Sequence, residues 1–151
     1  MHRIAAAIQI LRPRRKVYEF AVTPSTWRLW HPWSGGVWPR CDHPLAIGEE
    51  IVEELRVAGR RAKVTWTLKE RKVPDYWVLE GSLPGHGTGS LIYRLTQNGR
   101  CTLCDRELLY NGVNPLLDRL VVRPQLLWEA RESLASLKRL LEGGEEKRAR
   151  R

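Results

Sequence analysis

The chain has little cysteine and no long apolar run, and both absences narrow the class of protein. Its three cysteines are an odd number, so a disulfide framework like that of small secreted domains is not expected. A reducing cytoplasm is then the expected compartment. No stretch reaches the roughly 18 to 20 apolar residues that a membrane-spanning helix needs. The first apolar run, IAAAIQIL at residues 4–11, leads into a basic segment rather than a cleavage site, so we interpret it as a strand.

Signatures of common catalytic, metal and nucleotide sites are also missing. There is no GxSxG motif, no P-loop and no dinucleotide fingerprint, and the glycines of residues 82–89 lie between expected strands. The CTLC segment at 101–104 has the spacing of half a zinc site, but its cysteines would face opposite sides of a strand. His31, His43 and His86 stand in loop-like contexts that favour a surface or capping role. We expect no metal and no cofactor.

Acidic residues are outnumbered, which leaves a net charge of +9. The basic residues gather at 12–16, 59–63 and 147–151. Such segments can bind an anionic partner such as a nucleic acid. However, no helix-turn-helix, zinc-finger or RNA-binding aromatic motif accompanies them. We therefore favour a solvated basic surface with a frayed tail, and nucleic acid is not an expected partner.

What the chain has in quantity is tryptophan, with seven Trp against one Phe. Its length of 151 residues suits one domain with one core. Trp27, Trp30 and Trp33 stand close together in the segment TWRLWHPWSGG, where a helical pattern gives way to glycines. Such a cluster either fills a core or lines a binding pocket.

The apolar pattern predicts a strand, two short helices, about six strands and one long helix. Residues 4, 6, 8 and 10 form the apolar face of the first strand, and the helices follow at Pro13–Ala21 and Trp27–Trp30. Residues 62–68 alternate most clearly, and further strands are expected at 49–57, 76–83, 89–96 and 101–110.

The long helix is expected from Pro115 to Leu141, with a possible break near Pro124. An apolar stripe at helical spacing would pack it against the sheet. Gly143 and Gly144 are expected to end it. The domain then spans residues 1–142, and residues 143–151 form a charged, disordered tail.

Turn signals predict which strand residues share a face. A two-residue Asn98-Gly99 turn would pair Tyr93 with Cys104 and Leu91 with Arg106, so that Arg106 points inward if these apolar residues do. A turn at Ala58-Gly59 would place Glu53 opposite Val64, also inside. A one-residue shift of either hairpin would reverse these assignments.

Several segments, taken in this order, resemble the START-like superfamily, also called SRPBCC, which includes the birch pollen allergen, polyketide cyclase-like proteins and lipid-transfer domains. The resemblance covers about residues 2–142. It rests on RRKVYEFAVTPSTWRLWHPW, LAIGEEIVEEL, VTWTLKE, GSLIYRLTQNG and EARESLASLKRLLE. It implies an α+β helix-grip fold, in which a curved seven-stranded antiparallel sheet wraps the terminal helix and leaves a cavity between them.

This resemblance implies a ligand site inside the cavity. The candidate ligand-binding residues are Trp30, Trp33, Trp38, Glu53, Val64, Trp66, Trp77, Leu79, Leu91, Tyr93, Arg106 and Leu127. A buried charge needs a partner, so Arg106 and Glu53 either contact a ligand, contact each other or lie hydrated at the mouth. Tyr93 either offers its hydroxyl to a ligand or is a core residue. No catalytic residue is assigned.

Three functions stay open at this point. The resemblance implies first a carrier or sensor that binds a hydrophobic small molecule, lipid-like or aromatic, in the cavity. The alternative is an enzyme of the polyketide cyclase/aromatase type, in which one or two polar groups assist proton transfer. A basic interaction or nucleic-acid module is the third. The chain is expected to be a monomer or a homodimer.

Overall fold

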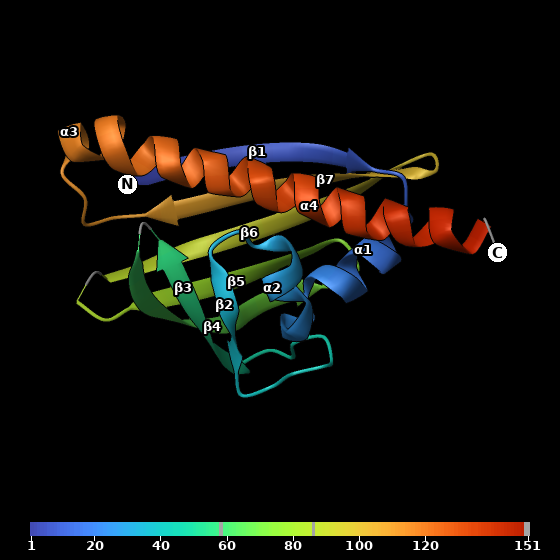
Figure 1. The fold of residues 1–151 in the computed structure, drawn as a ribbon, viewed down its shortest axis with the longest axis horizontal. Helices are drawn as coiled ribbons and strands as arrows, with labels where there is room; N and C mark the ends of the chain where they lie inside the picture. The colour runs from blue at the N-terminus through green and yellow to red at the C-terminus, as the bar shows by residue number, and fades with distance from the viewer. Residues whose placement is uncertain (58, 86, 150–151) are drawn as a thin grey trace.

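The computed structural model describes residues 1–57, 59–85 and 87–149. Ala58 of the expected 58–59 turn, His86 and the last two arginines of the basic tail lie outside the described residues. In the described chain, seven strands form one sheet in the order β1-β7-β6-β5-β4-β3-β2, and every neighbouring pair is antiparallel (Figure 1). The strands are β1 (His2–Ile10), β2 (Ser34–Trp38), β3 (Glu50–Val57), β4 (Arg60–Lys72), β5 (Tyr76–Leu83), β6 (Gly87–Asn98) and β7 (Cys101–Tyr110).

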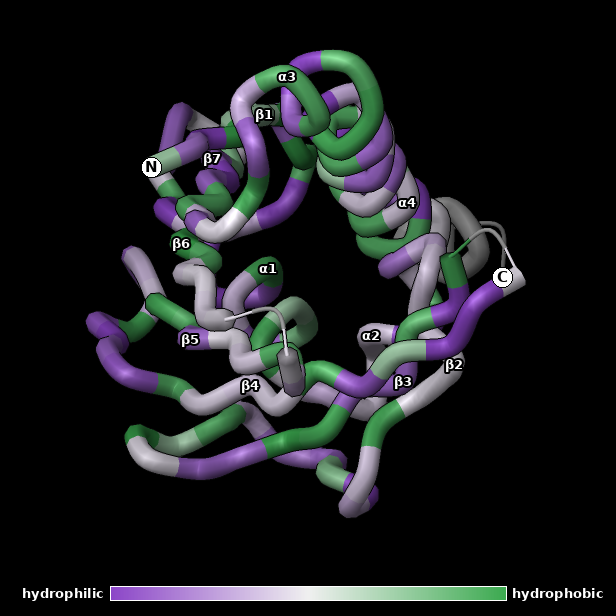
Figure 2. The backbone as a smooth tube through the Cα atoms, turned by 90° about the vertical axis from the view of Figure 1, so that its left-hand side faces the viewer, coloured by the Kyte–Doolittle hydropathy of each residue, from purple (hydrophilic) through white to green (hydrophobic). Residues whose placement is uncertain are grey.

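The helices lie on the concave side of this sheet. They are α1 (Arg14–Ala21), the 3-10 turn η1 (Pro24–Thr26), α2 (Trp27–Trp30), α3 (Pro115–Leu117), the π-helical η2 (Asp118–Val122) and α4 (Arg123–Ala149). Helix α4 packs against β1 and α2. Figure 2 shows the sheet curling around an interior that α4 borders on the opposite side. This is the predicted helix-grip architecture, with the two short helices after the first strand.

An aromatic cluster fills the part of the interior next to α1 and α2. The Trp77 and Tyr93 rings stack with centroids 4.7 Å apart, and Tyr18 meets Trp77 edge to face at 5.3 Å. Trp30 packs against Tyr93, and the Trp27 indole donates a hydrogen bond to the Ala21 carbonyl. All five side chains are almost fully buried. Leu134 and Leu137 of α4 close this core, as the apolar stripe predicts.

The β6–β7 turn lies one residue later than predicted, which shifts the pairing of the two strands by two residues. Asn98 pairs with Cys101, so Gly99 and Arg100 are the turn residues, and Tyr93 pairs with Arg106 instead of Cys104. Gly99 has φ 61° and is the first turn residue, where the mirror-image hairpin turns require positive φ. A shift of two residues keeps each side chain on its face. Arg106 therefore still points inward, and Glu53 pairs with Val64 as predicted.

The C-terminal helical segment begins at Pro115, as predicted, and differs from the prediction at its other end. Five residues, Asp118–Val122, form a π-helical turn, so the break precedes Pro124. At the other end, α4 continues through Gly143 and Gly144 to Ala149. Each glycine costs a helix about 1 kcal/mol relative to alanine, which does not stop a helix when good helix formers such as the Glu, Lys and Arg residues after it continue the pattern.

Replacing Gly143 by alanine therefore tests the helix end. A Cβ at Gly143 would meet no atom within 4 Å, so Gly143→Ala is expected to raise the free energy of unfolding by about 0.5–1 kcal/mol. Gly99→Ala is the control and should destabilise the fold, because its φ is positive. Urea unfolding followed by tryptophan fluorescence measures both. A destabilised Gly143→Ala would instead indicate that the helix ends at this glycine.

Candidate functional site

A cavity of about 440 Å³ lies between the concave sheet face and the N-terminal half of α4. This volume is within the range of sites for small organic molecules. Its walls are mostly apolar and come from the segment between α2 and β2, strands β3 to β7, the segment after β7, η2 and α4. The apolar side chains in them include Trp33, Leu55, Val64, Trp66, Leu83, Leu91, Leu108, Val113, Val122 and Leu126.

Glycines on the inner sheet face help to keep this space open. Gly81 and Gly89 both line the cavity. A Cβ at Gly81 would lie 2.6 Å from the Trp66 ring, so the indole occupies the place that a side chain would take. At Gly89, a Cβ would lie 2.9 Å from the Leu109 carbonyl oxygen. Gly81 thus leaves room for the Trp66 ring against the sheet, and Gly89 allows the close approach of the Leu109 backbone.

The first polar group in the wall is Glu53 of β3, which is only 2% exposed. Its Oε2 lies 2.9 Å from His31 Nδ1, and its Oε1 accepts a 3.1 Å hydrogen bond from the Trp66 indole. Burial acts to raise the pKa of Glu53, but the His31 charge and the hydrogen bonds from His31, Ser34 and Trp66 outweigh burial and hold that pKa below its usual value. The Trp30 ring fixes the imidazole at a centroid distance of 4.1 Å.

The second polar group joins the sheet to the helix. Arg106 Nη2 of β7 donates a 2.8 Å hydrogen bond to Glu129 Oε2 of α4, and the Ser133 hydroxyl donates to the other Glu129 oxygen. Burial acts to lower the pKa of Arg106, but the nearby Tyr93 and Glu129 outweigh it and raise that pKa, so the guanidinium stays charged. Among the described residues, the buried Tyr93 hydroxyl and Arg106 Nε each make no hydrogen bond.

A third polar group fixes the end of the cavity near α3. The Tyr110 hydroxyl donates to Asp118 Oδ1, and Asp118 also contacts His2 Nδ1 at 3.2 Å and Arg123 Nε at 3.3 Å. Burial, followed by this hydrogen bond, raises the pKa of Tyr110 to about 12. Because Asp118 begins the π-helical turn, these bonds tie the helical segment over the cavity to β1 and β7.

The structure brings half of the predicted site residues together. The cavity wall contains Trp33, Glu53, Val64, Trp66, Leu91 and Arg106. Glu53 and Arg106 point inward as predicted. They are not partners of each other, since Glu53 pairs with His31 and Arg106 pairs with Glu129.

Four other predicted residues belong to the core and not to the cavity wall. Trp30, Trp77, Leu79 and Tyr93 are all nearly fully buried in the cluster next to α1 and α2. They lie on the predicted sheet face, but in the half of it that the short helices and the end of α4 fill. The Tyr93 hydroxyl is enclosed there, so it is not available to a molecule in the cavity.

Two predicted residues point elsewhere. Trp38 is 75% exposed, because it pairs with Val52 on the outer face of the edge strand β2, one position after the inward Val37. Leu127 is half-buried outside the cavity wall, and its neighbour Leu126 lines the cavity instead. One residue turns a helix by about 100°, which is enough to exchange their roles.

Sequence reasoning missed two functional candidates, His31 and Glu129. His31 lay in a segment interpreted as a helix end, and nothing in the sequence linked it to Glu53. Glu129 and Ser133 carried a usable signal, because they stand four residues apart and follow Leu126 at helical spacing. A polar pair inside an apolar stripe predicts a buried polar contact.

The fold and the cavity together define a START-like helix-grip protein, a fold suited to hydrophobic ligands. The chain belongs to the family described as polyketide cyclase / dehydrase and lipid transport, whose model matches residues 1–142. No curated protein matches the chain in a sequence comparison. Among the described residues, no helix is long and apolar enough to cross a membrane.

Solved structures show the same fold at low sequence identity. A START superfamily protein from Mycobacterium smegmatis superposes with a TM-score of 0.66 at 15% identity, over 97% of this chain and 99% of that one. Ara h 8.0201 gives 0.71 at 12% identity, over 94% and 98%. Protein CV1439 from Chromobacterium violaceum gives 0.71 at 15%, over 94% and 99%.

The Arg106–Glu129 pair is expected to act as a unit. Arg106→Met leaves a buried carboxylate without its cation and should lower the free energy of unfolding by about 3–5 kcal/mol, while Arg106→Met combined with Glu129→Leu should recover most of that loss. Arg94→Met, on the exposed outer face of β6, is the control and should change stability little. Urea unfolding measures all three. A double variant as unstable as Arg106→Met alone would contradict the coupling.

The depressed pKa of Glu53 predicts an acid-dependent stability difference. Since the folded pKa lies below that of an unfolded glutamate, about 4.3, the charged group stabilises the fold fully above that pH, and the effect is lost as the pH falls from there through the folded pKa. Glu53→Gln should therefore lower the free energy of unfolding at pH 7 by about 1–3 kcal/mol. The difference from wild type should shrink below about pH 4.3. Urea unfolding across pH 3 to 7 tests this, and a difference constant with pH would refute it.

Proposed function

We propose that the protein binds a hydrophobic small molecule, lipid-like or aromatic, in the cavity, as a carrier or sensor. The observation that carries this proposal is a largely apolar cavity of about 440 Å³ with few polar side chains in its wall, of which Glu53, Arg106 and Glu129 are buried. Membership of a family described by polyketide cyclase, dehydrase and lipid transport supports the same ligand class. The three cysteines are free, which agrees with the proposed cytoplasmic location.

The wall chemistry supports a ligand that is mostly apolar with one or a few polar groups. Trp33 and Trp66 give flat apolar surfaces on which a ring or chain can lie. Arg106 and Glu129 lie in the same wall as His31 and Glu53, so a polar group of the ligand would meet hydrogen-bonding partners. A few placed polar groups in an apolar site orient a ligand more than they add affinity.

The alternative is an enzyme of the cyclase/aromatase type acting in this cavity, and the His31–Glu53 pair is the observation that favours it. When His31 is neutral and its Nδ1–H donates to Glu53, Nε2 is left as a proton acceptor. His31 lines the cavity, so this nitrogen could take a proton from a bound molecule. No comparable observation favours the third function, a basic interaction or nucleic-acid module. Such a module would be expected to have a filled core, whereas this interior contains a cavity.

Native mass spectrometry of the protein from its own host tests the ligand class. A co-purifying apolar molecule would support binding, and its steady conversion to a second mass by the purified protein would favour the enzyme. A protein that emerges without a bound molecule and takes up no lipid or aromatic compound from a small panel would speak against both.

Filling the cavity should abolish binding without changing the outer face. Leu108→Trp adds a large ring to the cavity wall, and we expect it to weaken ligand affinity at least tenfold, the equivalent of about 1.4 kcal/mol. Ile92→Trp on the opposite face of the neighbouring strand is the matched control and should bind as wild type does. Fluorescence titration with the co-purifying molecule, or with a lipid probe such as a naphthalene dye, compares them. Equal affinities would place the ligand elsewhere.

A further inference from the structure

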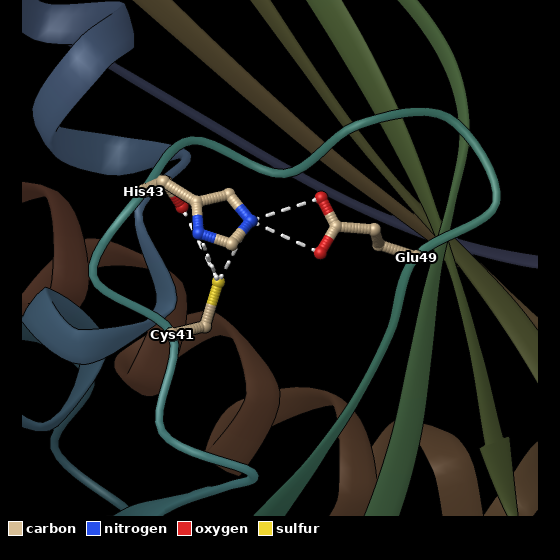
Figure 3. A group of neighbouring side chains, drawn as sticks. All are labelled: Cys41, His43 and Glu49. Atoms are coloured by element: carbon tan, nitrogen blue, oxygen red, sulfur yellow. Dashed lines mark hydrogen bonds and ion pairs between the residues drawn. The ribbon is translucent and has the colours of Figure 1, made fainter.

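The connection between β2 and β3, residues 39–49, brings together three side chains that no part of the proposed function uses. Figure 3 shows Cys41, His43 and Glu49 pointing toward one another from this loop. None of them lines the cavity. Cys41 is 4% exposed, His43 is exposed and Glu49 is half-buried, so the group reaches from the protein interior to its surface.

The donor atoms of the three residues are close and chemically diverse. Cys41 Sγ lies 3.6 Å from His43 Nε2, and the same nitrogen lies 3.1 Å from both carboxylate oxygens of Glu49. One donor atom from each residue lies within 4.8 Å of the other two. Thiolate, imidazole and carboxylate are the three ligand types that Zn²⁺ prefers in proteins.

Two of the three separations are close to those of a tetrahedral site. With Zn–S near 2.3 Å and Zn–N or Zn–O near 2.0–2.1 Å, donor atoms around one zinc ion stand roughly 3.3–3.6 Å apart. The sulfur–nitrogen distance already falls in this range, and the nitrogen–oxygen distance lies just below it. We propose that Cys41, His43 and Glu49 form a Zn²⁺ site with water in the fourth position.

The loop holds two of the three ligands before any metal arrives. The Cys41 carbonyl accepts a hydrogen bond from Ser25 N, which fixes the loop to η1. Glu49 Oε1 accepts from Ala46 N at 2.8 Å, and the Gly48 amide bonds to the Leu68 carbonyl of β4. The thiolate and the carboxylate are therefore placed by buried or bonded backbone. Only the exposed imidazole has to rotate to aim a ring nitrogen between them.

Zinc binding replaces the thiol hydrogen bond that Cys41 Sγ makes to the His43 carbonyl. The thiol proton passes to solvent, and the thiolate bonds to the ion. Because the ligands come from both ends of one loop, the ion would clamp that loop onto the sheet. This inference departs from the expectation of no metal, since Cys41 and His43 alone have no diagnostic spacing and Glu49 joins them only through the fold of the loop.

The experiment uses the untagged, full-length protein stripped of metal by a chelator. Co²⁺ replaces Zn²⁺ in such sites and reports thiolate and tetrahedral ligation by its absorption spectrum. We expect one Co²⁺ per chain with a thiolate-to-cobalt charge-transfer band, displaced by Zn²⁺, and a rise in Tm on adding Zn²⁺. The absence of the band at saturating Co²⁺ would overturn the proposal.

Variants assign the ligands. Cys41→Ser and His43→Ala should each abolish the band, and Glu49→Gln should weaken Zn²⁺ affinity at least tenfold, measured by competition with a chromophoric chelator. His43 is exposed, so His43→Ala keeps the test valid if Cys41→Ser fails to fold.

The matched controls are Cys101→Ser, a thiol on β7, and Asp42→Asn, an exposed carboxylate of the same loop that pairs with Arg40. Both should bind Co²⁺ as wild type does. A band that survives His43→Ala, or that disappears in Cys101→Ser, would show that the metal binds at a different place. Either result would reject this site.

Discussion

The ion pair between Arg106 of the sheet and Glu129 of α4 crosses the interior of the molecule and decides how sheet and helix face each other. A curved sheet and one helix enclose more space than the side chains of either can fill. The aromatic cluster of Trp77, Tyr93 and their neighbours occupies one half, and the ion pair lies where this core meets the cavity. Removing one partner would leave a charge in a place that water hardly reaches. The pair thus lines the candidate site and also holds the helix against the sheet.

Much of the fold followed from local patterns. Period two predicted β5 and β7 to the residue, and the stripe on α4 predicted the burial of Leu134 and Leu137. The register of β6 and β7 was wrong by two residues, because two turns compatible with Asn98-Gly99 place the glycine differently. The predicted end of α4 was wrong, because the helix propensity of the surrounding residues outweighs the free-energy cost of two glycines in a helix. Local signals determine the type of an element better than its last residue.

The site was predictable only in part, for a geometrical reason. Alternation along a strand tells which face a side chain takes, and it placed Glu53, Val64, Leu91 and Arg106 correctly. It does not tell which half of that face other elements cover, and this is why Trp30, Trp77, Leu79 and Tyr93 lie in the core. Partners such as His31 for Glu53 arise from contacts between distant segments. Such contacts have no periodic signature.

The pairing of charges in the cavity wall has a consequence for selectivity. Glu53 faces His31, and Glu129 faces Arg106, so each acidic group in these two pairs already has its basic partner. A ligand carboxylate or ammonium would have to leave water and displace one member of a pair to find a counter-ion, and the desolvation of both groups opposes that exchange. A neutral molecule with a carbonyl or hydroxyl group faces no such barrier. If the cavity binds a small molecule as proposed, these pairs would favour the uncharged form of an acidic compound over its anion.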